Sequence, residues 1–288
     1  MKALFAAALV LFATIGAHAT TPAELEAQAQ KAYDERDFTQ AGVQRAQDAS
    51  NLFGQLAGEL QKAGDKAKYA EIRVRQAAAC FFMGDASKDS EVKKTQFWNG
   101  YSLAKEGVTY YQVKDVSNVS DADLQRLLKL SADDRTKLAE ALYVSGINLG
   151  QWGEASGVMQ SLNKWPELRD SMELMVKIGM KELHEYGAYR TLGIAYFRIP
   201  ALLGGSVPKA TQYLTKAVTS TLATGQVYSV NGFNNLFYAE LLKDAGKDAE
   251  AKKILQDFLK ADSSNLLPGY SAETKNAQRL ANEMLKNW

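Results

Sequence analysis

The sequence has little of what most catalytic and metal sites need. Only two histidines and one cysteine occur among its 288 residues, so Cys/His catalysis and most metal sites are poorly supported. Cys80 has no second cysteine to pair with, which excludes an internal disulfide. Because it lies in the apolar run 77–82, we expect a buried thiol that packs as a small hydrophobic side chain. The composition predicts a protein that is not an enzyme and that holds no metal or cofactor.

A basic excess is also missing. The chain has 34 Lys and Arg residues against 33 Asp and Glu, a net charge of +1. A surface dedicated to nucleic acid normally shows a basic balance or stripe, so no nucleic-acid partner is expected. Walker A, dinucleotide-binding and nucleophile-elbow motifs do not occur, which leaves phosphate binding and hydrolase chemistry without support. These absences favour a binding or interaction protein.

The first residues predict export. A lysine follows Met1, an apolar run covers residues 3–15, and an Ala-x-Ala sequence ends at Ala19. These are the features of a secretory signal peptide, and the apolar run is shorter than the ~20 residues that span a bilayer. No cysteine follows the run, so a lipoprotein anchor is not expected. We predict a signal peptide over residues 1–19 and a soluble periplasmic protein over residues 20–288.

Proline is scarce and strand-like alternation is nearly absent, which favours helices. Apolar residues recur at spacings of three and four, and the pattern predicts an all-α fold of about thirteen helices in one domain. The clearest helices are expected over residues 23–36, 38–63, 65–83, 88–112 and 271–286. Pro200 is expected to end one helix, and Ser206 to begin the next.

Two helix pairs match the tetratricopeptide pattern of large and small residues. The matching residues are Tyr189, Leu192, Gly193 and Tyr196 with Ala210 and Leu214, and then Ala239, Leu242, Gly246, Ala251 and Leu255. In this pattern the large side chains wedge between helices, while Gly and Ala let paired helices approach closely. The copies are degenerate and irregularly spaced. They therefore predict an irregular tetratricopeptide-like array, not a regular superhelix.

The first of these pairs contains an unusually long connection. Residues 198–206 are apolar and include Pro200, Gly204 and Gly205, where a standard repeat has a shorter turn. Two interpretations are open for this loop. It packs onto the array, with the glycines forming a turn, or it forms the wall of a ligand cavity.

Aromatic residues make up 10% of the chain and are concentrated in a few places. Most are expected to wedge between helices. The alternative is that five of them partly line a ligand cavity: Trp98, Trp152, Tyr186, Tyr189 and Tyr196. The two interpretations differ in whether these rings contact each other or an enclosed space.

Polar residues near the same segment could recognise a ligand. Arg190 and Arg198 flank the apolar face of the repeat, and a planar guanidinium binds a carboxylate through two parallel hydrogen bonds. Pairing with a neighbouring Asp or Glu is the alternative for both. Asn234, next to Asn235, could orient a polar head group.

Two further features resemble metal-binding or catalytic sites, but we expect neither of them to be one. The segment 85–90 begins like a calcium loop, but Ser90 stands where the sixth-position Gly belongs and Gln96 where the twelfth-position Glu belongs. We expect a solvated cluster at a helix start. His184, the only histidine after the signal peptide, is expected at a helix end on the surface.

Several segments resemble a known family. The residues are 186–193, 198–206, Lys209-Ala210 and Lys216-Ala217, with further similarity at 149–153 and 276–285. They are similar to the T-component (TatT) family of periplasmic helical proteins associated with TRAP-type transporters. The resemblance implies an all-helical fold of tetratricopeptide-like pairs and a capacity to form homotrimers. It also implies a DctP-type periplasmic solute-binding protein as partner, and a small hydrophobic ligand. Many members are lipoproteins, whereas this sequence lacks the cysteine for such an anchor.

Two functional hypotheses follow. The first is a TRAP-transporter-associated protein that holds or channels a small, hydrophobic or organic-acid ligand, and it predicts an apolar cavity near Arg190 and Tyr196. The second is a tetratricopeptide-like interaction scaffold of the cell envelope, and it predicts an open groove that grips an extended peptide.

Overall fold

The fold is all-α. The computed structural model describes residues 20–288, so the predicted signal peptide at 1–19 lies outside the described residues. Within the described part, the chain forms helices and turns, apart from one antiparallel bridge between Leu222 and Ser229. None of the helices described is long and apolar enough to cross a bilayer.

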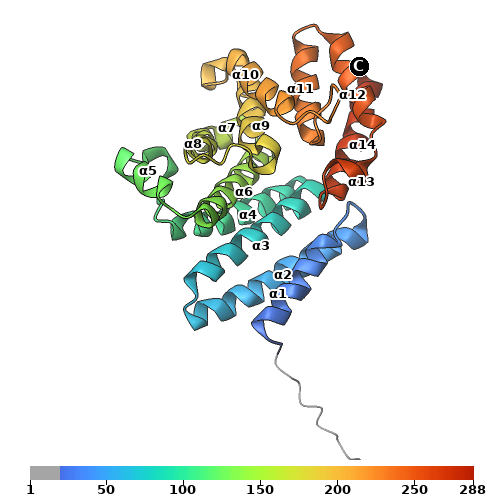
Figure 1. The fold of residues 1–288 in the computed structure, drawn as a ribbon. Helices are drawn as coiled ribbons and strands as arrows, with labels where there is room; N and C mark the ends of the chain where they lie inside the picture. The colour runs from blue at the N-terminus through green and yellow to red at the C-terminus, as the bar shows by residue number, and fades with distance from the viewer. Residues whose placement is uncertain (1–19) are drawn as a thin grey trace, which may run out of the picture.

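The helices follow one another with short connections (Figure 1). Their bounds are α1 Pro22–Asp34, α2 Gln40–Ala63, α3 Lys66–Ala86, α4 Ser90–Tyr110, α5 Asp121–Leu128, α6 Ala132–Ser156, α7 Val158–Ser161, α8 Trp165–Lys177, α9 Leu183–Arg198, α10 Val207–Thr219, α11 Gly232–Asp244, α12 Asp248–Leu259, α13 Ser263–Leu266 and α14 Ser271–Asn287. Short 3-10 turns cover Val116–Asn118, Leu162–Lys164 and Ala201–Leu203. Since α7 and α13 have four residues each, the sequence-based estimate of about thirteen helices is close.

Capping residues explain many of these boundaries. Thr21 and Glu24 form a reciprocal capping box at the start of α1, and Asp89 accepts hydrogen bonds from two backbone N–H groups of α4. Gly64 ends α2 in the left-handed conformation, with φ of 77°. Ser206 caps α10, as the sequence predicts, and Pro200 follows the end of α9.

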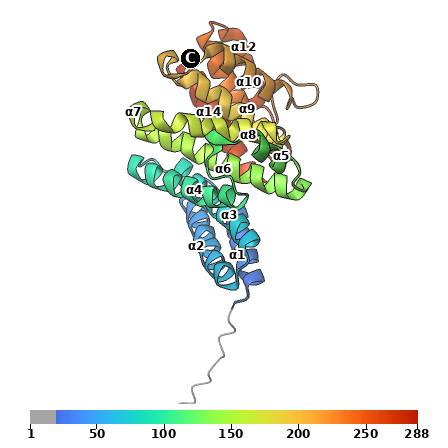
Figure 2. The same ribbon diagram turned by 90° about the vertical axis from the view of Figure 1, so that its left-hand side faces the viewer.

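Each helix packs mainly on its neighbours in the sequence. Contacts run from α1 through α4 to α6, then from α8 through α9 and α10 to α11, α12 and α14. Figure 2 shows the result as stacked layers, with α1 to α3 at one end and α10 to α12 at the other. The largest hydrophobic core lies in the middle, between α4, α6, α8, α9 and α10. Smaller cores hold together α1 to α3 and α11 to α14.

Small residues allow the closest helix contacts. A Cβ at Gly193 would lie 2.6 Å from Leu214 Cγ, so glycine is required for α9 and α10 to approach this closely. This pairing is the one expected from the repeat pattern, and α11 packs on α12 as the second expected pair. Cys80 is 4% exposed, which confirms a buried thiol, and burial raises its pKa to about 11.

The two ends of the array meet through polar contacts. Arg36, just after α1, donates from Nη2 to Glu273 Oε1 in α14 at 2.6 Å, and its side chain is 4% exposed. Asn276 of α14 donates to Asp85 at the end of α3, at 3.4 Å. Figure 1 shows α13 and α14 returning to lie near the end of the α1–α2 hairpin. The return places a space between the two halves of the chain.

Candidate functional site

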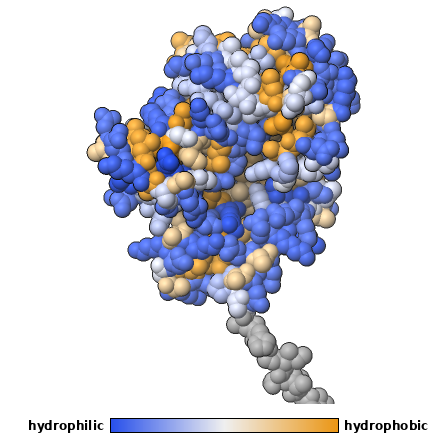
Figure 3. All heavy atoms as spheres, in the orientation of Figure 1, coloured by the Kyte–Doolittle hydropathy of each residue, from blue (hydrophilic) through white to orange (hydrophobic). Residues whose placement is uncertain are grey.

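A cavity of about 640 Å³ lies between the two halves. Its walls come from α3 and α6 on one side, α9 and α11 on another, and α14 where the array closes. Most of the lining side chains are apolar, for example Ala78, Phe81, Val144, Ile147 and Phe233. In Figure 3 hydrophobic residues, coloured orange, lie in the hollow near the centre of this face. A cavity of this size and lining is typical of a small-molecule site.

Arg190 lies in the cavity wall and has only neutral acceptors. It is 7% exposed. Its Nη1 donates to Asn234 Oδ1 at 3.0 Å and to the His184 carbonyl at 3.2 Å, and its Nη2 donates to the hydroxyl of Tyr143. Within residues 20–288 no carboxylate oxygen lies within 4.0 Å of its nitrogens. A buried charge normally has a paired counter-charge, so Arg190 is left with an uncompensated charge at the cavity wall.

The guanidinium of Arg190 also has donors to spare. It carries five N–H groups, of which the three hydrogen bonds above use three. Nε–H and one Nη2–H are left without an acceptor in the described part of the chain. Thr191, the next residue, also lines the cavity. The arrangement can accept an anionic oxygen ligand from the cavity side.

The segment before Arg190 has an unusual backbone. His184, Glu185 and Tyr186 have φ of 54°, 50° and 59°, three consecutive non-glycine residues in the left-handed region. Such residues are costly and persist only where surrounding contacts hold them. Here Arg190 donates to the carbonyl of His184, and Asn234 Nδ2 donates to the carbonyl of Glu185 at 3.2 Å. The network around Arg190 therefore also fixes the conformation of the cavity wall.

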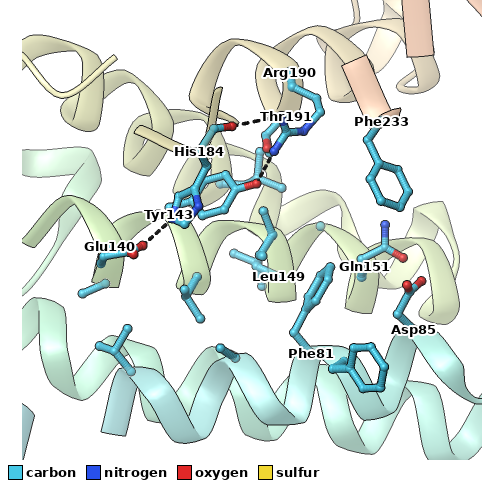
Figure 4. Close-up of a pocket in the computed structure, with 18 of the residues that line it drawn as sticks. Phe81, Asp85, Glu140, Tyr143, Leu149, Gln151, His184, Arg190, Thr191 and Phe233 are labelled. Carbon is cyan, nitrogen blue, oxygen red and sulfur yellow. Dashed lines mark hydrogen bonds and ion pairs between the residues drawn. The ribbon is translucent and has the colours of Figure 1, made fainter. Parts of the chain in front are cut away.

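The left-handed turn places a histidine in the cavity. His184 stacks on the ring of Tyr143, with centroids 4.1 Å apart, and its Nε2 forms an ion pair with Glu140 (Figure 4). Its side chain is 15% exposed. His184 therefore lies at a helix end, as expected, but the expectation that it is a surface residue is wrong. Helical periodicity could not reveal the position, because the three left-handed residues break that periodicity at the start of α9.

Asp85 forms a second polar region at the far side of the cavity. It lines the cavity with Gln151 and Phe233 beside it, whereas Arg190 lies across the space (Figure 4). Burial raises the pKa of Asp85 to about 6. Lys93 and Arg279 lower that pKa, and Glu273 and Glu154 raise it. In the part of the chain described, no basic group lies within 4.0 Å of its carboxylate.

The expectation of a solvated helix-start cluster over residues 85–90 is therefore only half right. Asp89 is exposed and caps α4, but Asp85 lies in the last turn of α3 and faces the cavity. The sequence contained a signal for this. Ala78, Phe81 and Asp85 follow one another at spacings of three and four, which places them on the same face of a helix. Across residues 20–288 no cluster of side chains could hold a metal ion.

The predicted arginines and asparagine come together around α9. Arg198 also lines the cavity, but Glu154 and Glu240 both pair with it, the latter at 2.9 Å. Asn234 lies behind the wall, fully buried, where it accepts from Arg190. Arg198 thus matches the alternative of pairing with neighbouring acids, whereas Arg190 has no acid partner among the described residues.

The five predicted aromatic residues lie outside the cavity lining. Tyr186, Tyr189 and Tyr196 form a ladder with Tyr213 of α10, with successive ring centroids 5.9, 5.7 and 5.9 Å apart. Trp98 and Trp152 contact each other at 5.0 Å between α4 and α6. The three tyrosine rings face α10, because the side of α9 that carries them is turned towards that helix, and they match the interpretation as wedges between helices. Trp98 is 38% exposed and lies at the surface against Trp152.

The loop after α9 closes on itself through backbone hydrogen bonds and approaches Trp165 at Gly204, while Leu202 is fully exposed. Gly205 donates to the Pro200 carbonyl at 3.1 Å, and Ser206 donates to that of Tyr196 at 2.9 Å. Gly204 has φ of 99°, and a Cβ there would lie 3.2 Å from Trp165 Nε1. In the segment 199–205 only Ile199 reaches the cavity lining.

The sequence reasoning missed most of the residues that make the cavity polar. They are Asp85, Glu140, Tyr143, Gln151, His184, Thr191 and Tyr270. They come from α3, α6, α9 and the segment before α14, and only the tertiary fold brings them together. Comparison with other proteins adds no assignment, because no protein-family model matches the chain and no curated protein is significantly similar to it.

Proposed function

We propose that this protein is a periplasmic ligand-handling protein that holds a small amphipathic organic acid in its central cavity. The carboxylate of the ligand binds Arg190, and its hydrocarbon part lies against the apolar walls. The observation that supports this most directly is the buried guanidinium of Arg190, which has two free N–H donors and no acid partner at the wall of a 640 Å³ cavity.

The transporter connection rests on the resemblance to the TatT family. On that basis the protein works with a TRAP-type transporter, and its partner is a DctP-type periplasmic solute-binding protein that delivers or receives the ligand. Tetratricopeptide-like helix pairing and homotrimers belong to the same proposal. Native mass spectrometry of protein taken from its own periplasm, with organic extraction, tests it. We expect a bound organic acid and co-purification of a solute-binding protein.

Binding in vitro tests the site itself. Dodecanoate serves as the probe and dodecanol as its uncharged counterpart, with affinity measured by isothermal titration calorimetry. Arg190→Gln is expected to weaken dodecanoate binding by about tenfold or more, since it removes a charge-assisted pair, and to leave dodecanol binding unchanged. The matched control is Arg198→Gln, on the same helix and the same cavity wall. Its guanidinium is already paired, so we expect a change within about twofold.

A second variant keeps the test valid if Arg190→Gln fails to fold. Ala78→Trp adds a large side chain to the cavity wall without removing a polar contact. It is expected to abolish binding of both probes while circular dichroism stays unchanged. Binding of dodecanoate that survives both variants would contradict the proposed site. Capture of extended peptides in place of small molecules would favour the scaffold function.

A further inference from the structure

Asp85 has fewer partners than a half-buried carboxylate usually has. The structure gives it one hydrogen bond, in which Asn276 Nδ2 donates to its Oδ2 at 3.4 Å. Two neighbouring acids each have a basic partner: Glu154 pairs with Arg198, and Glu273 pairs with Arg36. Asp85 Oδ1 therefore remains an unused acceptor at the cavity wall. An acceptor in this position can accept a hydrogen bond from a donor on the cavity side.

Gln151 also lines the cavity, and its side chain is unused as well. Figure 4 shows its amide on the same side of the cavity as Asp85. Within residues 20–288 the amide makes no side-chain hydrogen bond, so it offers both an N–H donor and a carbonyl acceptor. Asp85 and Gln151 thus present one anionic acceptor, one neutral donor and one neutral acceptor to the cavity.

The wall between the two polar regions is apolar. Phe81 and Leu149 lie between Asp85 and Arg190 in Figure 4, and Val144 and Ile147 also line the cavity. A molecule that spans the cavity therefore meets a cationic donor at one end, hydrocarbon in the middle, and an acceptor with a donor at the other end. A plain fatty acid would satisfy only the first two.

We propose that the ligand has a hydroxyl group at the end opposite its carboxylate, and that Asp85 and Gln151 bind this hydroxyl. The hydroxyl donates to Asp85 Oδ1 and accepts from the amide of Gln151. An ammonium group could donate to Asp85 and to the carbonyl of Gln151, whereas a hydroxyl uses one acceptor and one donor and brings no charge that must lose its hydration in an apolar cavity, so the hydroxyl fits better. This inference rests on the proposed function, because it requires the carboxylate to be bound at Arg190.

Three probes of equal chain length test the assignment: dodecanoate, ω-hydroxydodecanoate and ω-aminododecanoate. The full chain after signal-peptide removal is titrated with each probe by calorimetry. We expect the hydroxy acid to bind about tenfold more tightly than dodecanoate, since a hydrogen bond to a charged group has an effect of this size. We expect ω-aminododecanoate to bind less tightly than ω-hydroxydodecanoate.

Variants locate the effect. Asp85→Ala is expected to remove the preference for the hydroxy acid, so that dodecanoate and ω-hydroxydodecanoate bind the variant with equal affinity. Gln151→Leu is expected to reduce the preference in part. The control is Glu91→Ala, an acid in the first turn of α4 whose side chain is 80% exposed, and it should leave the preference intact.

The possible results separate the two proposals. Equal binding of dodecanoate and its hydroxy derivative, with both weakened by Arg190→Gln, would overturn the hydroxyl assignment and leave the proposed function standing. No binding of any acid would overturn the proposed function itself. Tightest binding of the amino acid, lost in Asp85→Ala, would overturn the hydroxyl in favour of a cationic end group.

Discussion

Two arginines of α9 line the same cavity but differ in burial and in their partners. Arg190 and Arg198 lie about two turns apart and both line the cavity. Arg198 is partly exposed and held between Glu154 and Glu240, whereas Arg190 is buried among neutral acceptors. Charge near a cavity is therefore no guide to ligand binding by itself. Arg190 differs from Arg198 in its burial, its free donors and its lack of an acid partner, and the proposed function assigns the ligand carboxylate to it for these reasons.

Substitution of Asn234, which bonds to Arg190 and not to Arg198, should have the largest effect on stability. Asn234 is fully buried, and its amide bonds the Glu185 and Ala217 carbonyls and two hydroxyls while its carbonyl accepts from Arg190. Asn234→Ala would leave these buried groups unsatisfied and free the left-handed turn. We expect a loss of about 3 kcal/mol in the free energy of unfolding, measured by urea denaturation.

Asn235→Ala is a useful comparison for that result. Asn235 is equally buried but bonds only to the backbone of Ser229, away from Arg190. Both variants should lose stability, but only Asn234→Ala should also weaken dodecanoate binding. If Asn235→Ala weakened binding equally, the network would act through general stability and not through the position of Arg190.

Asp85 extends the comparison to an acid without a basic partner. Its pKa is about 6 in the folded protein, raised by burial from an ordinary value of 3.8, so the folded state holds an extra proton between these values. Stability is therefore lost as pH rises through this window, because the buried carboxylate becomes charged. Asp85→Asn should remove this loss and raise the free energy of unfolding at pH 7 by about 2 kcal/mol.

The measurement compares urea denaturation of the two proteins at several pH values from 4 to 7.5. The difference between variant and wild type should grow with pH and level off above about pH 7. Lys93, Arg279, Glu154 and Glu273 are present in both proteins, so only their interactions with the Asp85 charge differ between the two. A constant difference across the range would show that Asp85 titrates normally.

A smaller effect is expected from the hydroxyl of Tyr143. It accepts from Arg190 Nη2, and the ring of the same residue stacks on His184. Tyr143→Phe removes the acceptor and keeps the stacked ring. We expect a loss of about 1 to 2 kcal/mol by urea denaturation, since a charged donor loses a buried partner. Bound dodecanoate should offset part of this loss, and no such rescue by the ligand would argue that the carboxylate binds elsewhere.

The sequence predicts the helical fold of this molecule better than it predicts the roles of the residues that line the cavity. The all-α class, the buried Cys80 and the caps at Asp89 and Ser206 all follow from local patterns, which depend on residues within a few positions of each other. The choice between ligand and ion-pair roles for Arg190 and Arg198 could not be made this way. It depends on which acids the fold brings near, and Glu240 lies more than forty residues from Arg198 in the chain.

The cavity could not be predicted from the sequence, because it depends on contacts between residues that are even farther apart in the chain. It exists because α14 returns to α1 and α3 through Arg36–Glu273 and Asn276–Asp85, contacts between the two ends of the chain. His184 was misplaced for a different reason. Three consecutive left-handed residues have no sequence pattern of their own, and only their partners Arg190 and Asn234 explain them.

The smallest effect on stability is expected from substitution of Glu240, which pairs with Arg198, and it tests the difference between the two arginines. Glu240→Gln removes one of two acids from a partly exposed guanidinium, and exposed ion pairs contribute about 0 to 1 kcal/mol. We therefore expect a loss below 1 kcal/mol that shrinks further in 0.5 M salt, measured by urea denaturation. Removal of this acid also leaves Arg198 with a partly free guanidinium at the cavity wall. If dodecanoate then binds more tightly, an unpaired arginine at this wall is sufficient to attract the acid; unchanged affinity would show that burial, as at Arg190, is also required.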